Sequence, residues 1–259
     1  GISAKENPLY EEAKELKGEY SMLQREVILD LKRSNLGLVG TKALIHEQLK
    51  AYICRMATFH SYRDLQIVVF YDDKYRMSFD WIKWLPHCRI SNLNVYGMVH
   101  SEKTRDQIVN SLNQILKERA QRIEESKKES RFLPHFVFII DEPKYIMDHS
   151  IMEYLSLGGD KLGFSIIYTS HLRANLPDFI DTVLVLENSK EGVLLLKERE
   201  FFNKTIYTHN NEHVNMEFFA RNLSALNHVL GTTSYIPQSV TFFELYKILL
   251  PDSGCLVWF

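Results

Sequence analysis

The feature that most constrains this sequence is an uninterrupted apolar run, Phe136 to Ile140, which is followed directly by Asp141 and Glu142. A short continuous apolar run is typical of a strand that is buried on both faces of a parallel sheet. An apolar strand that ends in Asp-Glu is also the Walker B pattern, in which the Asp holds the water shell of Mg²⁺ and the Glu polarises the attacking water. A structural alternative remains, because an acidic residue at a strand end can simply cap the next element.

The surrounding sequence predicts strands that alternate with helices. Apolar runs indicate strands at residues 27–31, 35–39, 65–71, 95–99, 135–140 and 164–169. Helical spacing indicates helices at residues 4–20, 44–56, 101–128, 151–157 and 214–229. Residues 183–186 and 193–196 flank a turn-forming segment, which indicates a hairpin. This order predicts an α/β fold, with a mostly parallel sheet, helices on both faces and a terminal antiparallel hairpin.

Length and composition limit what the chain can do. Its 259 residues fit one large α/β domain, and no Pro-rich or Gly-rich linker divides them. Lys plus Arg number 31 and Asp plus Glu number 33, so the net charge is −2 and the basic excess of a nucleic-acid-binding protein is missing. Cys54, Cys88 and Cys255 are scattered, which argues against a disulfide framework or a zinc site. The longest apolar run is far shorter than the roughly 18 residues that cross a bilayer.

A second motif lies where the strand at residues 35–39 meets the following helix. A P-loop reads G-x-x-x-x-G-K-[ST]: its N–H groups wrap the phosphates, its Lys reaches the β- and γ-phosphates, and its hydroxyl binds Mg²⁺. Here the segment reads GLVGTKA from Gly37, with a second glycine at Gly40. Thr41 stands before Lys42 in place of glycine, and Ala43 replaces the hydroxyl residue. Because β-branched Thr resists the positive φ of a phosphate nest, we expect a plain turn or weak anion binding at the helix N-terminus.

Two further segments contain residue types that can carry chemistry. His171 and Arg173 follow the strand at residues 164–169, where P-loop ATPases often place a polar sensor of the γ-phosphate; a surface loop is the alternative. His87 and Cys88 are neighbours after Trp-Leu-Pro. Adjacent residues seldom point at one centre and no third ligand is evident, which favours packing around a buried, hydrogen-bonded His.

Taken together, these segments resemble a FtsK/SpoIIIE-type P-loop ATPase domain of the EssC/EccC family, the membrane ATPases of type VII secretion. The best match is the first, degenerate ATPase domain of that family. The resemblance covers about residues 7–247. It is carried by residues 7–9 (NPL), 20–21 (YS), 36–40 (LGLVG), 57–65 (ATFHSYRDL), 84–87 (WLPH), 139–142 (IIDE) and 236–242 (IPQSVTF). The combination of TFHS, WLPH and IPxSVTF is specific, whereas each motif alone is weak.

The resemblance implies an organisation and a set of site residues. It implies a helical segment at residues 1–22, the P-loop-type domain at residues 23–247 and an unassigned tail at residues 248–259. If Mg-ATP is bound, Asp141 holds the metal and Glu142 is the catalytic residue. The degenerate nucleotide site would be formed by Gly37, Gly40, Thr41, Lys42 and Asp141.

The resemblance also implies a setting. The chain is expected to be a cytoplasmic domain of a bacterial inner- or plasma-membrane protein, hexameric at full length. Its expected partners are other domains of the same ATPase, other subunits of the secretion machine and WXG100-type substrates, with no nucleic acid.

The leading hypothesis is a pseudo-ATPase module that holds no cofactor and couples or assembles the export machine. The rivals are an active motor that hydrolyses ATP with Mg²⁺ and, disfavoured by the charge balance, a DNA translocase. If the P-loop fold is right, the strand at residues 136–140 lies next to residues 36–39 or one strand away, so that Gly40 and Asp141 share one sheet edge. Asp141 is then expected to cap the turn or to pair with Lys42.

Overall fold

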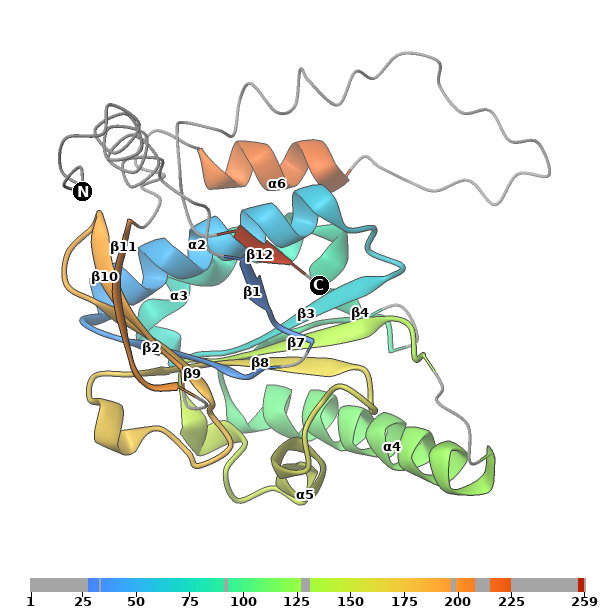
Figure 1. Ribbon diagram of the computed structural model, residues 1–259. Helices are drawn as coiled ribbons and strands as arrows, with labels where there is room; N and C mark the ends of the chain where they lie inside the picture. Colours follow the sequence, from blue (N-terminus) through green and yellow to red (C-terminus); the bar gives the residue numbers. More distant parts are fainter. Residues whose placement is uncertain are drawn as a thin grey trace, which may run out of the picture.

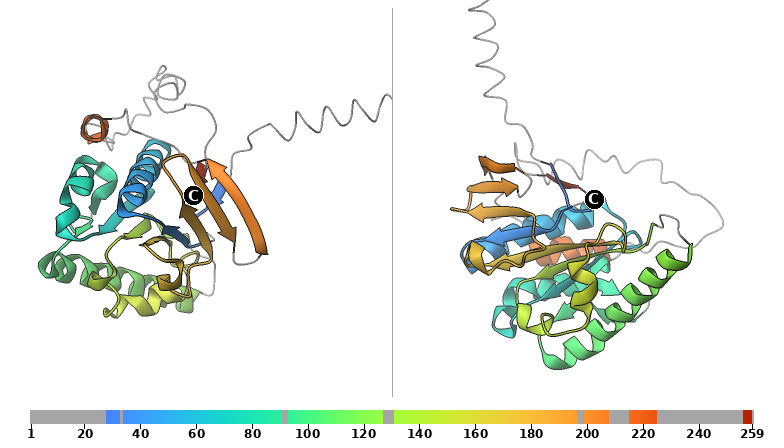
Figure 2. Two further views of the ribbon diagram at one scale, coloured as in Figure 1. Left: turned by 90° about the vertical axis from the view of Figure 1, so that its left-hand side faces the viewer. Right: turned by 60° about the horizontal axis from the view of Figure 1, so that its bottom comes forward.

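The computed structural model describes residues 28–32, 34–90, 93–126, 131–196, 199–207, 215–224 and 256–258. Its centre is an eight-stranded sheet with the order β11-β10-β9-β2-β8-β7-β3-β6 (Figure 1). Six strands run parallel: β2 (Leu36–Val39), β3 (Leu65–Phe70), β6 (Met98–Val99), β7 (His135–Ile140), β8 (Phe164–Ser170) and β9 (Thr182–Leu186). The antiparallel strands β10 (Glu191–Leu196) and β11 (Arg199–Tyr207) extend one edge (Figure 2). The predicted parallel sheet with a terminal hairpin is confirmed.

Helices cover both faces of this sheet (Figure 1). On one face lie α2 (Lys42–Phe59), α3 (Arg76–Phe79) and α6 (Met216–Ser224). On the other lie α4 (Glu102–Ser126) and α5 (Ile151–Ser156). No helix in the part of the chain that the structure describes is both long and apolar enough to span a membrane.

The central strands are apolar throughout because each of them is buried on two sides. In β3, Ile67 and Val69 belong to the core beneath α2, whereas Val68 and Phe70 belong to the core beneath α4 and α5. Successive strand residues point to opposite faces, so a continuous apolar run fills both cores at once. This is why the runs in the sequence identified the central strands correctly.

Smaller elements connect and flank the sheet. The 3₁₀ turns are η2 (Asp73–Tyr75), η3 (Asp80–Trp84), η4 (Pro86–Cys88), η5 (Pro143–Tyr145) and η6 (Arg173–Asn175). Strands β4 (Arg89–Ile90) and β5 (Val95–Tyr96) form an antiparallel pair. Strand β1 (Ile28–Asp30) pairs in parallel with β12 (Leu256–Trp258), so part of the unassigned tail at residues 248–259 is a strand.

Several predicted elements differ from the structure or lie outside it. The single strand predicted at residues 95–99 is wrong: Gly97 divides it into β5 and β6, because its N–H donates to the Cys88 carbonyl (2.6 Å) and its carbonyl accepts from Val69 N–H (2.8 Å). The tryptophan-containing turn before Pro86 is 3₁₀ (η3). The helix predicted at residues 4–20 lies outside the described residues, as do residue 214 and residues 225–229 of the last predicted helix.

Candidate functional site

The candidate site lies at the carboxyl edge of the parallel strands, where nucleotides bind in folds of this class. Strand β8 separates β2 from β7, so Gly40 after β2 and Asp141 after β7 lie at the same edge. The Gly40 N–H donates to the Ser170 carbonyl at the end of β8 (3.1 Å). The predicted arrangement of the two motifs is therefore confirmed.

The turn between β2 and α2 is short, with only Gly40 and Thr41 between strand and helix. Thr41 is the N-cap: it is extended (φ −71°, ψ 151°) and its Oγ1 accepts from Leu44 N–H at 3.4 Å. Gly37 lies inside β2 and does not contribute to the turn. A Cβ on Gly40 would approach Leu186 Cβ to 3.2 Å, so this glycine accommodates the close approach of β9. Neither glycine is among the described residues with positive φ.

Lys42 and Asp141 bind each other. The Lys42 Nζ donates to the Asp141 Oδ1 (2.7 Å) and to the Asp141 backbone carbonyl (2.8 Å). The Asp141 side chain is buried, at 1% exposed, and that of Lys42 is 26% exposed. Of the two roles expected for Asp141, capping the turn or pairing with Lys42, the structure shows the pairing.

Two more side chains complete the surroundings of Asp141. Thr169 in β8 donates its hydroxyl to Oδ1 (2.7 Å). His46, one helical turn after Lys42, lies with Nε2 3.0 Å from Oδ2; because an ionised carboxylate only accepts, the imidazole N–H donates. Burial alone would raise the pKa of Asp141, but the hydrogen bond and attraction of His46, with the charge of Lys42, hold this pKa below its ordinary value.

His46 connects Asp141 to the segment that follows β3. Its Nδ1 lies 3.2 Å from the Ser78 Oγ in α3. Its ring packs edge-on against Tyr75 (5.0 Å between centroids) and Phe79 (4.8 Å). Neither His46 nor Thr169 is predicted from the sequence. The one available signal for His46 is its four-residue spacing from Lys42, which places the side chains of Lys42 and His46 on one face of α2.

Glu142 does not join this cluster. Its side chain accepts from the Lys144 N–H (3.3 Å) and is the N-cap of η5. Its own N–H donates to the Phe70 carbonyl (2.9 Å), next to the bond from the Asp141 N–H to the same oxygen (2.8 Å). Capping is the role that the structural alternative assigned to the acidic pair, and the structure places Glu142 in it.

The other candidates from the sequence are placed as the structural alternatives predicted. His171 and Arg173 are exposed in the loop after β8. His87 is buried with Nε2 2.6 Å from the His60 carbonyl, and burial lowers its pKa. Within the described ranges, no group of three His, Cys, Asp or Glu side chains is arranged to hold a metal ion.

The residues at the edge do not fit Mg-ATP. A P-loop needs inward-facing N–H groups, a Lys directed at phosphate and a hydroxyl on the metal. Here the Gly40 N–H bonds to β8, Lys42 binds the carboxylate and Ala43 has no hydroxyl. Asp141 already accepts from three side chains, so a metal ion could reach its oxygens only by displacing one of them.

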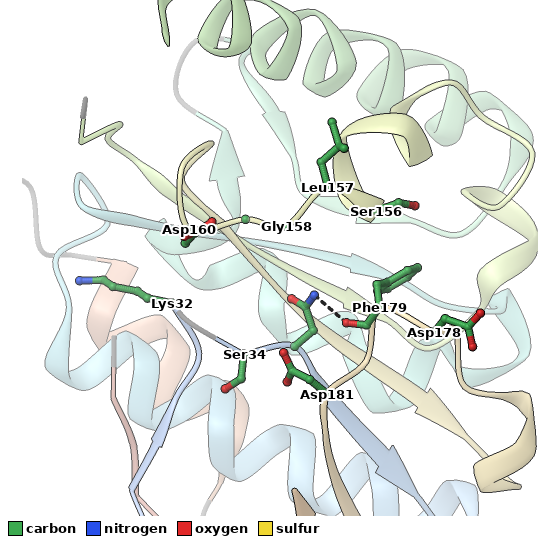
Figure 3. Close-up of a pocket in the computed structure, with 11 residues that line it drawn as sticks. Lys32, Ser34, Ser156, Leu157, Gly158, Asp160, Asp178, Phe179 and Asp181 are labelled. Atoms are coloured by element: carbon green, nitrogen blue, oxygen red, sulfur yellow. Dashed lines mark hydrogen bonds between the residues drawn. The ribbon is translucent and has the colours of Figure 1, made fainter. Parts of the chain in front are cut away.

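A polar pocket of about 280 Å³ lies elsewhere, at the amino ends of β2, β8 and β9 (Figure 3). Its wall includes Lys32, Asn35, Asp160, Asp178 and Asp181. The Asn35 side chain donates to the Phe179 carbonyl there (3.1 Å). Because nucleotides bind at the carboxyl ends of parallel strands, this pocket is not the counterpart of an ATP site.

Comparison with known proteins identifies the family. The type VII secretion system protein EssC of Staphylococcus aureus (strain NCTC 8325 / PS 47) is 33% identical over 251 residues, which is 95% of this chain. The ESX secretion system protein EccC of Geobacillus thermodenitrificans (strain NG80-2) is 33% identical over 220 residues, or 85% of the chain. The chain belongs to the EssC/EccC family. It spans only 17% and 15% of the lengths of these two relatives, and no family model matches it.

A solved structure supports the fold assignment. ATPases 2 and 3 of EssC from Geobacillus thermodenitrificans superpose with a TM-score of 0.57 at 12% identity, covering 86% of this chain and 46% of that one. At this identity the likeness concerns the fold alone. The EssC/EccC chain thus has the fold of a P-loop ATPase domain, as the sequence predicted.

Proposed function

We propose that this EssC/EccC chain is a pseudo-ATPase module, which couples or assembles parts of a type VII secretion machine without turning over ATP. The observation that carries the proposal is the ion pair between Lys42 and Asp141. An active P-loop ATPase directs these two groups at phosphate and at Mg²⁺. Here each group neutralises the other, and both would have to be released before Mg-ATP could bind.

The backbone of the turn supports the same proposal. Most of the affinity of a P-loop for ATP comes from charge-assisted hydrogen bonds and the metal bridge. Thr41 is extended and Ala43 lacks a hydroxyl, so this turn supplies neither a phosphate nest nor a metal ligand. Micromolar ATP affinity corresponds to only about 8 kcal/mol, and losing several of these interactions reduces binding to the millimolar range or below.

Calorimetric titration with ATP, with and without Mg²⁺, tests the proposal directly. We expect no micromolar binding and no multi-turnover hydrolysis. Glu142→Gln is the matched control: because Glu142 caps η5, the variant should show the same absence of turnover and nearly unchanged stability. Micromolar Mg-ATP binding together with hydrolysis that Glu142→Gln abolishes would contradict the proposal and favour an active motor.

The active motor is the second candidate because one observation favours it. Asp141 and Glu142 follow β7 at the correct edge of the sheet, one strand from the P-loop-like turn. For this edge to work, Lys42 must leave Asp141 and Glu142 must leave its cap. A crystal structure with ordered ATP and Mg²⁺ bridged to Asp141 would establish this candidate.

The proposal extends to the setting in which the module works. We place the module on the cytoplasmic side of a bacterial membrane, within a longer protein that forms a hexamer. Its partners would be other domains of that protein, other secretion subunits and WXG100-type substrates. The P-loop-type domain would extend over residues 23–247, with the preceding helical segment and the tail at residues 248–259 as flanks. Crosslinking in the full-length protein would identify the neighbours.

A further inference from the structure

The ammonium group of Lys42 lies where two oxygen atoms of one residue converge. Its Nζ is 2.7 Å from the Asp141 Oδ1 and 2.8 Å from the Asp141 backbone carbonyl oxygen. A carboxylate and a carbonyl oxygen are the ligand types that hard cations such as Mg²⁺ prefer. The position is also accessible from outside, because the Lys42 side chain is 26% exposed.

We propose that the Lys42 ammonium is a resident cation, which occupies the place of a metal ion beside Asp141 and keeps metal ions out. The inference rests on the proposed function, since it gives a physical reason why the edge does not recruit Mg-ATP. It predicts that the same two oxygens form a latent cation site. Two protein ligands completed by water molecules suit Mg²⁺, which keeps several of its waters in proteins.

The ammonium group of Lys42 is covalently attached to α2, which explains why it occupies this position in preference to a dissolved metal ion. Lys42 is the first residue of α2 and follows the N-cap, Thr41. The hydrogen bond from the Gly40 N–H to the Ser170 carbonyl holds the backbone of this turn against the end of β8. A tethered group competes at a high effective concentration. Mg²⁺ must in addition shed part of its hydration shell. His46 and Thr169 donate hydrogen bonds to the buried Asp141 carboxylate, and a cation beside Oδ1 stabilises it further.

The test replaces the ammonium and retains its aliphatic stem. Melting temperatures of the wild-type chain and of Lys42→Met are compared in 0–10 mM MgCl₂ at constant ionic strength, without nucleotide. For Lys42→Met we expect a saturable rise of about 3–5 °C, as given by a site with a dissociation constant near 1 mM. For the wild type we expect less than about 1 °C.

Two controls isolate the cause. Lys50→Met removes an ammonium from the same helix, where Lys50 pairs with the half-exposed Glu47 (2.7 Å), and should behave as the wild type does. Lys42→Met combined with Asp141→Asn removes the carboxylate charge as well, so it should show no response to Mg²⁺. The double variant also keeps the test informative if Lys42→Met alone is poorly folded, because a response to Mg²⁺ in it contradicts the proposal.

The outcomes separate this inference from the proposed function. A Lys42→Met protein that is indifferent to Mg²⁺, or a wild type that responds equally, would overturn the resident cation while leaving the lack of ATP turnover in place. ATP hydrolysis by the wild-type chain would instead overturn the proposed function, whatever the response to Mg²⁺ alone.

Discussion

At the residue scale, one buried carboxylate organises the candidate site. Asp141 accepts hydrogen bonds from Lys42 and His46 on α2 and from Thr169 on β8, so three elements meet at a single charge. A carboxylate in such a place is tolerated only when its hydrogen bonds are satisfied and its charge is balanced. The cluster therefore fixes α2 against the sheet in the absence of nucleotide.

Asp141→Ala should destabilise the protein by about 2–3 kcal/mol, because it removes the carboxylate that accepts from Lys42, His46 and Thr169. Urea unfolding measures the change. Asp80→Ala is the matched control: Asp80 pairs with Lys83 at the surface, where the loss should stay within about 0.5 kcal/mol. Equal effects of the two substitutions would show that the Asp141 cluster has no special role in stability.

Acid should destabilise the fold through His135. This side chain is buried at the start of β7 with Nε2 2.6 Å from the Ser165 Oγ, and burial lowers its pKa to about 3. In the unfolded chain the pKa is about 6.5, so between these values only the unfolded state binds the proton and stability falls as pH decreases. Asp141 adds to the loss at lower pH, since its depressed pKa keeps it ionised in the folded state.

His135→Gln removes the titrating group and retains a hydrogen-bonding side chain. We expect a shallower decline in the free energy of unfolding between pH 6 and pH 4, by up to about 1.4 kcal/mol per pH unit. The measurement is urea unfolding across that range. If wild type and variant decline in parallel, His135 does not carry the pH dependence.

The sequence revealed this cluster only in part. Asp141 and Lys42 could be paired in advance, because each belongs to a motif whose place on a parallel sheet is known. His46 and Thr169 could not be assigned to the cluster in advance, because the sequence of a helix or of a strand end does not indicate which polar side chain faces a neighbouring strand. That choice depends on how α2 packs across β7 and β8.

At the element scale, the turn between β2 and α2 determines what the site can bind. Only Gly40 and Thr41 connect the strand to the helix. The Gly40 N–H bonds to the Ser170 carbonyl, and Thr41 has the extended dihedral angles of an ordinary N-cap. The turn could be predicted as degenerate because Thr41 and Ala43 are visible in the sequence. The position of Gly37 inside β2 could not be predicted, because the same sequence, GLVGTKA, is also compatible with a longer loop that begins at Gly37.

Restoring the missing motif residues should not restore ATP binding. Thr41→Gly combined with Ala43→Ser recreates the Gly and the hydroxyl, but the connection stays too short to wrap phosphates and Lys42 keeps its carboxylate. We expect calorimetry to detect no micromolar Mg-ATP binding by this double variant. If the double variant bound Mg-ATP with micromolar affinity, the side chains at positions 41 and 43, and not the length of the turn, would be what prevents binding in the wild type.

Other elements show where local sequence patterns fail. The split of residues 95–99 follows from a backbone contact across the chain, since a Cβ on Gly97 would lie 2.5 Å from the Ile67 carbonyl oxygen. Strand β11 was missed because polar residues interrupt its apolar ones and it is stabilised by pairing with β10. The apolar runs at residues 65–71, 135–140 and 164–169, which need only burial, were identified correctly.

At the scale of the whole molecule, segments far apart in the sequence are joined at the side of α2. Strands β1 and β12 pair in parallel with Ile28 opposite Leu256, and β12 lies against α2 (Figure 1). The mostly parallel character of the large sheet and its antiparallel hairpin followed from the α/β pattern. This second, two-stranded sheet did not, because three-residue strands carry almost no pattern of their own.

Deleting residues 255–259 should remove the parallel partner of β1. A short ladder of this kind contributes about 1–2 kcal/mol, at roughly 1 kcal/mol for each hydrogen bond. We expect a lower urea midpoint and faster hydrogen exchange at residues 28–30, with deletion of Phe259 alone as the control. An unchanged midpoint would show that β12 adds nothing to stability.

The parallel direction of β1 and β12 has a mechanical consequence. In a parallel pair, tension that enters before the first strand and leaves after the second acts along the ladder, so its hydrogen bonds are stretched together and not opened one after another. A module threaded into a longer protein would thus meet pulling forces in shear, the direction in which a short ladder resists best. In antiparallel orientation the same two strands would be pulled apart from one end, and their hydrogen bonds would break one at a time.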